Sequence, residues 1–473
     1  MLHAALNRAR FRWRALAGTA GIVSLAAGAG IVLALFAGPA AGSKQAAHRV
    51  AGGRPFIDGA HLPPLLRLPG ERTVLRYDIY CTPSDDAPER GCAGNGTVFV
   101  RPGASGPYQA LRLTFDAQAV EGRYAAEVPA EIASSPTGFT YYAVLRDEVS
   151  GAAITLPAGG ADAPQQSLPI ADATVVDLGA HGFGFTRTPD ATVAAAAWGT
   201  GPRDVGLEEG RLQAPIGASS FDVGPDGAVN LLDEANRRLL RFARGRVSSV
   251  PLQVDGTIAD LAVAADGSLY VLESTGGDRE TPTLRRFDPD GTPRGSWGTA
   301  ERTTAAVRIG PNGPITLSYP SSEWMPASDG AQPLGVAAQA DAGTVARPLP
   351  GGSAGVVAYR LRDGHELRLA VVGPGGVSHA WRILSATAIA EVQLAQLLGS
   401  KLVTVFAAYT DEQSEFEVLV LDPTGAVQQF AVPAAEWAES APLARFRLDG
   451  SSLYQLGSTP SGVFVDRYDL GVN

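Results

Sequence analysis

The sequence predicts an all-β protein in which a small antiparallel β-sandwich precedes a six-bladed β-propeller, with one apolar segment near the N-terminus. Its 473 residues include 56 glycines and 34 prolines but only 2 methionines, a composition that favours short strands joined by turns. Apolar and polar residues alternate in many short runs, and a pattern of strands recurs about every 40 residues in the second half. A chain of this length is expected to hold two or more domains.

The first element is an uncharged apolar segment behind a basic N-terminus. Residues 15–38 carry no charge, and residues 1–14 contain Arg8, Arg10, Arg12 and Arg14. A bilayer is spanned by roughly 20 apolar residues, and arginines stay on its cytoplasmic side. We therefore expect residues 1–14 in the cytoplasm, a transmembrane helix over residues 15–38, and a single-pass cell-membrane protein with most of the chain extracytoplasmic. The alternative is a cleaved signal sequence and a secreted protein, with small residues at Ala40, Ala41 and Gly42.

Export would place the two cysteines in an oxidising compartment. Cys81 and Cys92 have no other cysteine to compete with them. The sequence therefore predicts a disulfide between them that closes a short loop. A redox or metal site would need closer spacing or neighbouring histidines, and neither is present.

A linker and a strand-rich domain follow the apolar segment. Residues 43–63 are small and polar, as in linkers. Residues 65–170 contain alternating runs such as RTVLRYDIY, GTVFVRP and FTYYAVLRD, and about seven short strands in this length are typical of an antiparallel sandwich. The run FTYYAVLRDEVSGAAITLP resembles the late strands of immunoglobulin-like or fibronectin type III-like modules. The resemblance implies that fold and no particular site.

Residues 171–473 contain an internal repeat. The stretch SSFDVGPDGAVNLLDEANRRLLRF is echoed by ADLAVAADGSLYVLESTGGDRETPTLRRF, and a third copy begins at AAVRIGPNGPITLSY. Strand repeats of this length are propeller blades, which bury their faces against one another. Blades are expected to start near Ser219, Ala259, Ala305, Val345, Ile389 and Pro442. The last blade lacks an outer strand, which we expect residues 191–201 to supply.

One repeat carries a family pattern. In NLLDEANRRLLRF, a short strand ends in an acid, Asp233, and the motif Asn-x-Arg follows at Asn236 and Arg238. An aliphatic residue, Leu239, and an aromatic residue, Phe242, come after it. This resembles the NHL repeat. The next unit keeps the acid, aliphatic and aromatic positions at Glu273, Leu284 and Phe287 but lacks Asn-x-Arg. The resemblance implies a six-bladed propeller that serves mostly for binding, with enzymes on related folds.

The charges in this repeat are expected to be structural. Asp226-Gly227, Asp266-Gly267 and Asp290-Gly291 have the residue types that tight hairpin turns require. The net charge of −10 argues against nucleic acid as a partner. The histidines of this region, His181, His365 and His379, are scattered in sequence, whereas zinc or acid–base sites need clusters. We expect no cofactor, with calcium left open, and these features favour a binding protein over an enzyme.

Long loops indicate where binding would occur. The turns between the first and second and between the third and fourth strands of each blade are tight, whereas the loops between the second and third strands are long. Long loops on a rigid scaffold usually carry recognition. The candidate binding residues in them are Asp278, Arg279, Glu323, Trp324, Asp411 and Glu412. Trp324 is expected either to anchor a contact or to cap its own blade.

These observations lead to a functional hypothesis with alternatives. We expect a membrane-anchored scaffold that recognises a protein or a glycan through the long-loop face of the propeller. The first alternative is an exported hydrolase or lyase, similar to lactonases, with a carboxylate or calcium site in the propeller channel. A structural envelope component is the second. Convergence of three or more Asp, Glu, Asn or His side chains on the channel would favour the enzyme.

Overall fold

The computed structural model confirms the all-β prediction. It describes residues 56–471 except 62, 83–92, 120–121, 158, 163, 211–212, 275–281, 300–303, 311–312, 319–322, 328–354, 362, 374–375 and 442. The described residues form strands β1 to β35 and one short helix, α3 (Ala130–Ala133). They fall into two compact units that divide between Ala171 and Asp172.

The predictions for the N-terminus fall on residues that the structure does not describe. Residues 1–14, the apolar segment 15–38 and most of the linker 43–63 lie outside the described part of the chain. Within the described part, no helix has the length and apolar character needed to span a membrane. The transmembrane helix and its alternative, a cleaved signal sequence, therefore stay predictions.

The first unit consists of two sheets. One has the strand order β1 (Phe56–His61), β3 (Val74–Thr82), β7 (Tyr124–Glu127) and β6 (Thr114–Phe115). The other has the order β2 (Leu66–Arg67), β10 (Gln165–Pro169), β8 (Phe139–Asp147), β4 (Gly94–Pro102) and β5 (Gln109–Arg112), with β9 (Ala153–Leu156) beside β8. All pairs are antiparallel except β2 and β10, which are parallel. The predicted antiparallel sandwich thus contains one parallel pair, because β2, near the start of the unit, lies beside β10, its last strand.

Period-two burial holds the two sheets together. On β4, Val98 and Val100 are fully buried while their neighbours are partly exposed, as alternation in a half-buried strand requires. They join one core with residues of both sheets, including Tyr77 of β3 and Leu145 of β8. Cys81 lies in β3, but Cys92 is outside the described residues, so the predicted disulfide stays a prediction.

The described residues of the second unit form six small sheets of three or four strands. The first sheet consists of β15 (Ser220–Val223), β16 (Val229–Asp233), β17 (Arg238–Ala243) and β18 (Arg246–Pro251). The second consists of β19 (Thr257–Val263), β20 (Leu269–Ser274), β21 (Thr283–Phe287) and β22 (Pro293–Gly298). The third consists of β23 (Thr304–Gly310), β24 (Gly313–Ser318) and β25 (Glu323–Pro326). A two-stranded sheet, β13 (Glu208–Gly210) and β14 (Gln213–Ile216), precedes them.

The other three sheets include strands from distant parts of the sequence. One consists of β26 (Gly355–Arg360), β27 (Glu366–Gly373) and β28 (Gly376–Leu384), with β11 (Thr174–Asp177) beside β28. The next consists of β29 (Ala388–Leu398), β30 (Lys401–Tyr409), β31 (Ser414–Asp422) and β32 (Gly425–Pro433). The last consists of β33 (Phe446–Asp449), β34 (Ser452–Thr459) and β35 (Gly462–Asp469), with β12 (Ala191–Ala197) beside β35. The predicted outer strand in residues 191–201 is therefore confirmed, because β12 pairs with β35.

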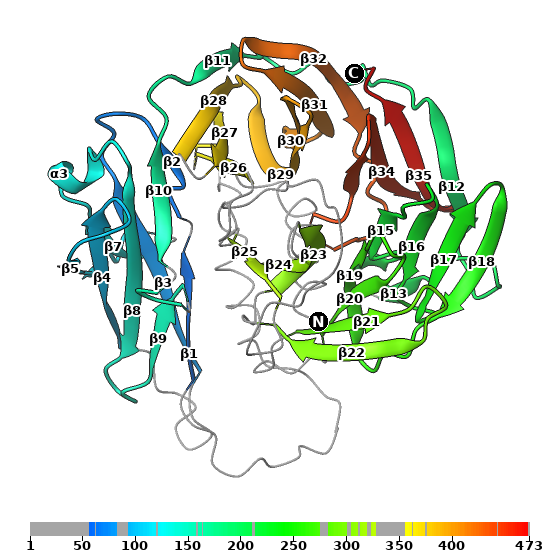
Figure 1. The fold of residues 1–473 in the computed structure, drawn as a ribbon, viewed down its shortest axis with the longest axis horizontal. Coiled ribbons are helices and arrows are strands. Elements are labelled where there is room, and N and C mark those ends of the chain that lie inside the picture. The colour runs from blue at the N-terminus through cyan, green and yellow to red at the C-terminus, as the bar shows by residue number, and fades with distance from the viewer. Residues whose placement is uncertain are drawn as a thin grey trace. The chain divides into compact units, whose positions relative to one another are not determined.

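The sheets follow one another around an arc in the manner of a β-propeller (Figure 1). Their first strands contact each other in the order β26, β29, β33, β15, β19, β23. Radial packing of small sheets through their first strands is the arrangement that defines propeller blades. Five of the predicted blade starts coincide with or lie close to β15, β19, β23, β29 and β33. The sixth, near Val345, lies outside the described residues, and the first described strand after it is β26.

The predicted hairpin turns are present. Gly227, Gly267 and Gly291 all have φ between +74° and +86°, a conformation that glycine adopts without strain. In the first of these turns, the Asp226 carboxylate also accepts a hydrogen bond from the Ala228 amide at 3.3 Å. The Asp-Gly pairs thus belong to the connections between strands, as their residue types predict.

One segment ties three blades together, and we call residues 174–197 the strap. It begins with β11, which pairs in parallel with β28, and ends with β12, which pairs with β35. Between them, Thr186 forms a parallel bridge to Ala431 of β32. In Figure 1 the strap runs from β11 past β32 to β12. The β26–β28 blade therefore obtains its outer strand from the strap, which sequence analysis did not predict.

Candidate functional site

The structure places the four described residues of the predicted binding set on two different blades. Asp278 and Arg279 lie outside the described residues. Glu323 and Trp324 lie in strand β25, opposite Ser318 and Leu317 of β24, whereas they were expected in a loop. The expectation of a loop was wrong because the apolar pair Trp324-Met325 continues a ladder that starts at β24. Residues 319–322, between β24 and β25, lie outside the described residues.

Asp411 and Glu412 occupy the predicted kind of position. Both are exposed in the turn between β30 and β31. The Thr410 hydroxyl fixes this turn by accepting hydrogen bonds from the amides of Glu412 at 3.3 Å and Gln413 at 3.1 Å. This is the turn between the second and third strands of its blade, so the two carboxylates lie on the face that was expected to bind.

Charged side chains meet where the first strands of four blades converge, in what we call the inner network. Asp260 of β19 is fully buried and accepts hydrogen bonds from Arg308 of β23 at 2.6 Å and from Arg447 of β33 at 3.1 Å. The Ser220 hydroxyl of β15 donates to the same carboxylate at 2.5 Å. These four residues come from four neighbouring blades, so no short stretch of sequence contains the cluster.

Two aspartates of the inner network also link blades through the backbone. Asp222 of β15 accepts a hydrogen bond from the Val263 amide at 2.7 Å. Asp260 accepts one from the Val307 amide at 2.9 Å. In each case a carboxylate on the first strand of one blade binds the first strand of the next blade. The network therefore holds neighbouring blades in register.

The charges of the inner network compensate each other. Burial raises the pKa of Asp222 despite its approach to Arg447. Burial also opposes ionisation of Asp260, but the nearby Arg308 and Arg447 outweigh it and lower the pKa of this carboxyl. Burial and the charge of Arg308 lower the pKa of Arg447 to about 10. Two acids against two arginines form a structural ion network, since each charge has a partner.

Among its described residues the inner network brings together two carboxylates, where three or more converging polar side chains would have favoured an enzyme. Both carboxylates are bonded to arginine, serine or backbone groups. Among the described residues, no group of three or more His, Cys, Asp or Glu side chains is arranged to hold a metal ion. The arrangement holds neighbouring blades together through these bonds.

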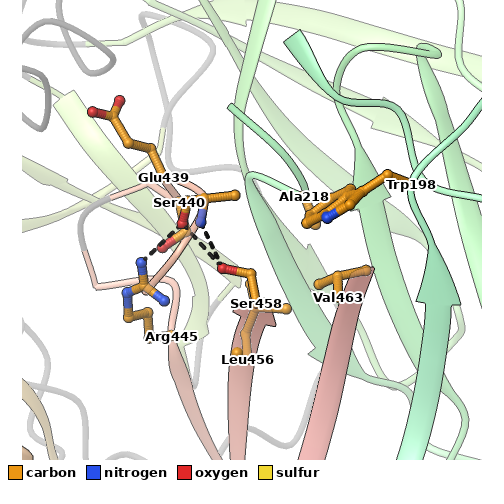
Figure 2. Close-up of a pocket in the computed structure, with 10 residues that line it drawn as sticks. Trp198, Ala218, Glu439, Ser440, Arg445, Leu456, Ser458 and Val463 are labelled. Atoms are coloured by element: carbon orange, nitrogen blue, oxygen red, sulfur yellow. Dashed lines mark hydrogen bonds between the residues drawn. The ribbon is translucent and has the colours of Figure 1, made fainter. Parts of the chain in front are cut away.

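A small cavity lies where the last blade meets the first. Its volume is about 10 Å³, room for about one water molecule. Trp198 and Ala218 line one side and Ser458 and Arg445 the other, and the Glu439 carboxylate points away from Trp198 (Figure 2). Ser458 accepts a hydrogen bond from the Ala438 amide at 2.8 Å. Sites for small molecules usually measure about 300–1,000 Å³, so this cavity serves packing.

A second charged cluster fixes the strap. His181 has its Nε2 2.9 Å from a Glu415 oxygen and its Nδ1 2.9 Å from a Glu417 oxygen. All three side chains are nearly buried. A neutral imidazole has one N–H, so both contacts are satisfied only if the histidine or one of the acids carries an additional proton. Sequence analysis missed this cluster because the acids follow the histidine by more than 230 residues.

The charges of the NHL-like stretch bind a neighbouring loop. The buried Asp233 carboxylate accepts hydrogen bonds from the Gly206 amide at 2.9 Å and from Arg238 at 2.8 Å. Arg238 in turn donates to the carbonyl oxygens of Gly201 and Asp204. In the next blade, Glu273 binds the Asp255 amide at 2.5 Å in the same way. In both blades the acid binds a backbone amide of a segment that precedes the blade in sequence. This agrees with the prediction that the charges of the repeat are structural.

The second unit is thus defined as a β-propeller by its own sheets. No family model matches the sequence, and no curated protein matches it. Solved structures similar to it include virginiamycin B lyase from Staphylococcus aureus, at 10% identity and TM-score 0.31, over 53% of this chain and 94% of that one. A gluconolactonase from Xanthomonas campestris has 14% identity and TM-score 0.28, over 60% and 100%. YCF48 from Cyanidioschyzon merolae has 12% identity and TM-score 0.29, over 55% and 98%.

These three are β-propeller-type proteins, as the arrangement of the sheets leads one to expect. Their names describe a lyase, a lactonase and a protein named without an activity. At these identities and TM-scores, the similarity is not used to infer the fold or the activity of this chain. The fold assignment rests on the order and contacts of the strands.

Proposed function

We propose that this protein is a membrane-anchored, extracytoplasmic scaffold whose propeller binds a protein or glycan ligand through the face that carries its second-to-third strand connections. The candidate contacts are Asp278, Arg279, Glu323, Trp324, Asp411 and Glu412. The proposal includes a closed ring of six NHL-like blades and an N-terminal helix in the membrane. No cofactor and no nucleic acid take part, and calcium stays the one ion to test.

The observation that carries the proposal is the state of the inner network. In an enzyme of the lactonase or lyase kind, carboxylates would converge on the channel and face a substrate. Here Asp222 and Asp260 are engaged with arginines and with backbone amides of neighbouring blades. The one cavity named above is too small for a substrate. A rigid propeller with a self-compensated centre is suited to presenting its surface loops.

The strand order of the first unit supports an immunoglobulin-like sandwich. In that fold one sheet has the order A-B-E-D and the other contains G-F-C. The orders β1-β3-β7-β6 and β10-β8-β4-β5 correspond to these arrangements. We propose that this unit is a spacer that holds the propeller away from the membrane, with Cys81 and Cys92 closing the connection between β3 and β4.

The test is a binding comparison on the full-length chain. Wild-type protein and the double variant Trp324→Ala/Asp278→Ala are used to capture ligands from the extracytoplasmic fraction of the native cells, and captured proteins and glycans are identified by mass spectrometry. We expect the double variant to lose the specific ligand by at least about tenfold, about 1.4 kcal/mol. The matched control is Asp290→Asn, which changes an acid in a tight turn on the opposite face. Equal capture by all three proteins would refute the proposal.

A further inference from the structure

Phe185 is the most exposed large apolar side chain among the described residues, with 85% of its surface accessible. Its neighbour Phe183 is half-buried and packs edge-on against His181, with ring centroids 4.6 Å apart. The strap thus turns one phenylalanine towards the blade and the other towards solvent. A single exposed apolar residue needs no explanation by itself, so the surroundings of Phe185 decide what it can do.

The backbone on both sides of Phe185 is fixed to the blade beneath it. The Gly184 amide donates to the Glu415 carboxylate at 2.8 Å, and the same carboxylate holds His181 through its other oxygen. On the other side, the Arg187 amide donates to the Ala431 carbonyl at 2.8 Å. Gly184 has φ of +88°, which permits the reversal between the two phenylalanines.

This anchoring gives Phe185 the properties of a preorganised contact residue. Aromatic side chains that insert into a partner's pocket contribute much of the energy of protein interfaces. A rigid backbone lowers the entropy that is lost on binding, since only the side-chain rotamer must be ordered. The nearly buried Glu415 contributes to this geometry by bonding two points of the strap at once.

Two exposed acids lie near Phe185, whereas the neighbouring Arg187 is paired with Asp190. Glu415, which holds Gly184, follows directly after the turn that contains Asp411 and Glu412. Phe185 therefore lies at the same end of the β29–β32 blade as these two exposed carboxylates. Within the described part of the chain, neither of them forms an ion pair, and the whole chain carries a net charge of −10. An acidic rim favours basic partners and repels acidic glycans and anionic lipids.

We infer that Phe185 and the Asp411-Glu412 turn form a docking site for a protein partner that offers an apolar pocket bordered by Lys or Arg side chains. This inference rests on the proposed function, because the site lies on the proposed binding face. It adds the strap as a contact element and specifies the chemistry of the partner.

Site-specific photo-crosslinking in the native cells tests the inference. The photoreactive amino acid p-benzoylphenylalanine replaces Phe185, Trp324 or Val427 in three separate full-length proteins, and adducts are identified by mass spectrometry. Val427 is the matched control, because it is an exposed apolar residue at the opposite end of the same blade. We expect an adduct with one protein at position 185 and none at position 427, and we expect the crosslinked peptide to contain Lys or Arg.

A charge reversal provides the second criterion. Glu412→Lys in the chain that is labelled at position 185 should reduce that adduct at least fivefold. Asp172→Lys, which changes an exposed acid two residues before the strap, should leave the adduct unchanged. An adduct with a second copy of this chain, with a glycan or with lipid only, or one that is insensitive to Glu412→Lys, would overturn the inference. Adducts at 324 but not at 185 would leave the proposed function standing, and adducts at neither position would remove both.

Discussion

The inner network shows how much one side chain can determine. Asp260 is completely buried, and its carboxylate receives two arginines, a serine and a backbone amide. Removing one member of a buried ion network costs more than the network contributes, because the remaining charges are then buried without compensation. The effect of a substitution here should therefore be large although the residue touches no ligand.

We predict that Asp260→Asn destabilises the propeller by about 3–5 kcal/mol. The asparagine keeps the size of the side chain but leaves Arg308 and Arg447 without the carboxylate that both contact. Equilibrium denaturation with urea gives the free energy of unfolding. The control is Asp266→Asn, in an exposed turn, which should cost less than about 1 kcal/mol. A loss below about 1 kcal/mol for Asp260→Asn would show that the network is not needed for stability.

His61 is the corresponding titratable residue of the sandwich. Its ring stacks on Tyr77 with centroids 4.2 Å apart, and its Nε2 lies 2.7 Å from the Tyr141 hydroxyl. Burial lowers the pKa of His61 to about 4, although the hydrogen bond to the Arg76 carbonyl opposes this change. A histidine that is neutral when folded binds a proton more readily when unfolded.

The stability of the sandwich should therefore fall in acid. The contribution of neutral His61 is complete above its ordinary pKa of about 6.5 and is lost as the pH falls towards about 4, up to about 3 kcal/mol. Hydrogen exchange of the β3 and β8 amides at pH 7, 5.5 and 4.5 measures this loss. His61→Gln should show a flatter dependence on pH. If variant and wild type lose protection in parallel, other groups control the response.

At the scale of elements, the strap replaces strands that the blades lack. The β33–β35 blade and the β26–β28 blade each have three strands of their own and receive a fourth from β12 and β11. An unpaired outer edge would expose backbone donors and acceptors, so the strap stabilises both blades by completing them. Arg187 of the strap also links the β33–β35 blade to the β29–β32 blade, by bonding the Asp469 carbonyl at 2.9 Å and stacking over Phe430.

Gly462 allows a test of this closure. A Cβ at this position would lie 2.2 Å from the Ala196 carbonyl oxygen, in the backbone of β12. Gly462→Ala should therefore push β12 away from β35 and cost about 1–3 kcal/mol, as overpacking does. Gly373→Ala is the control, because a Cβ there meets no atom within 4 Å. Thermal unfolding and proteolysis of the strap measure the effect, and equal midpoints for the two variants would contradict the role of Gly462.

At the scale of the molecule, each unit has its own core. The sandwich buries one continuous cluster that includes Leu75, Val98 and Leu145. The propeller buries several clusters, each shared by neighbouring blades, such as the one that joins Phe221 of the first blade to Leu456 and Val465 of the last. Stability in such an array comes from contacts between adjacent blades. The inner network and the strap add polar links between the same neighbours.

Much of this architecture could be predicted from sequence. Strands were expected at VNLLD and LYVLES because apolar residues form short runs there, and β16 and β20 are those runs. Turns were expected at Asp226-Gly227 and its equivalents because glycine tolerates the left-handed conformation. Trp324 is the instructive exception. Its polar neighbours indicated a loop, but pairing with Leu317 across the ladder made it part of a strand.

The sequence by itself determined the all-β class, the blade repeat and the outer strand β12, because these depend on alternation, turn chemistry and counting strands within about 40 residues. Only the tertiary structure decided the pairing of β11 with β28, the contact of His181 with Glu415, and the meeting of Asp260 with Arg447. Each of these joins residues that are far apart in the chain and leave no local pattern. They form because packed blades bring distant charges and strand edges together, and burial then requires each polar group to find a partner.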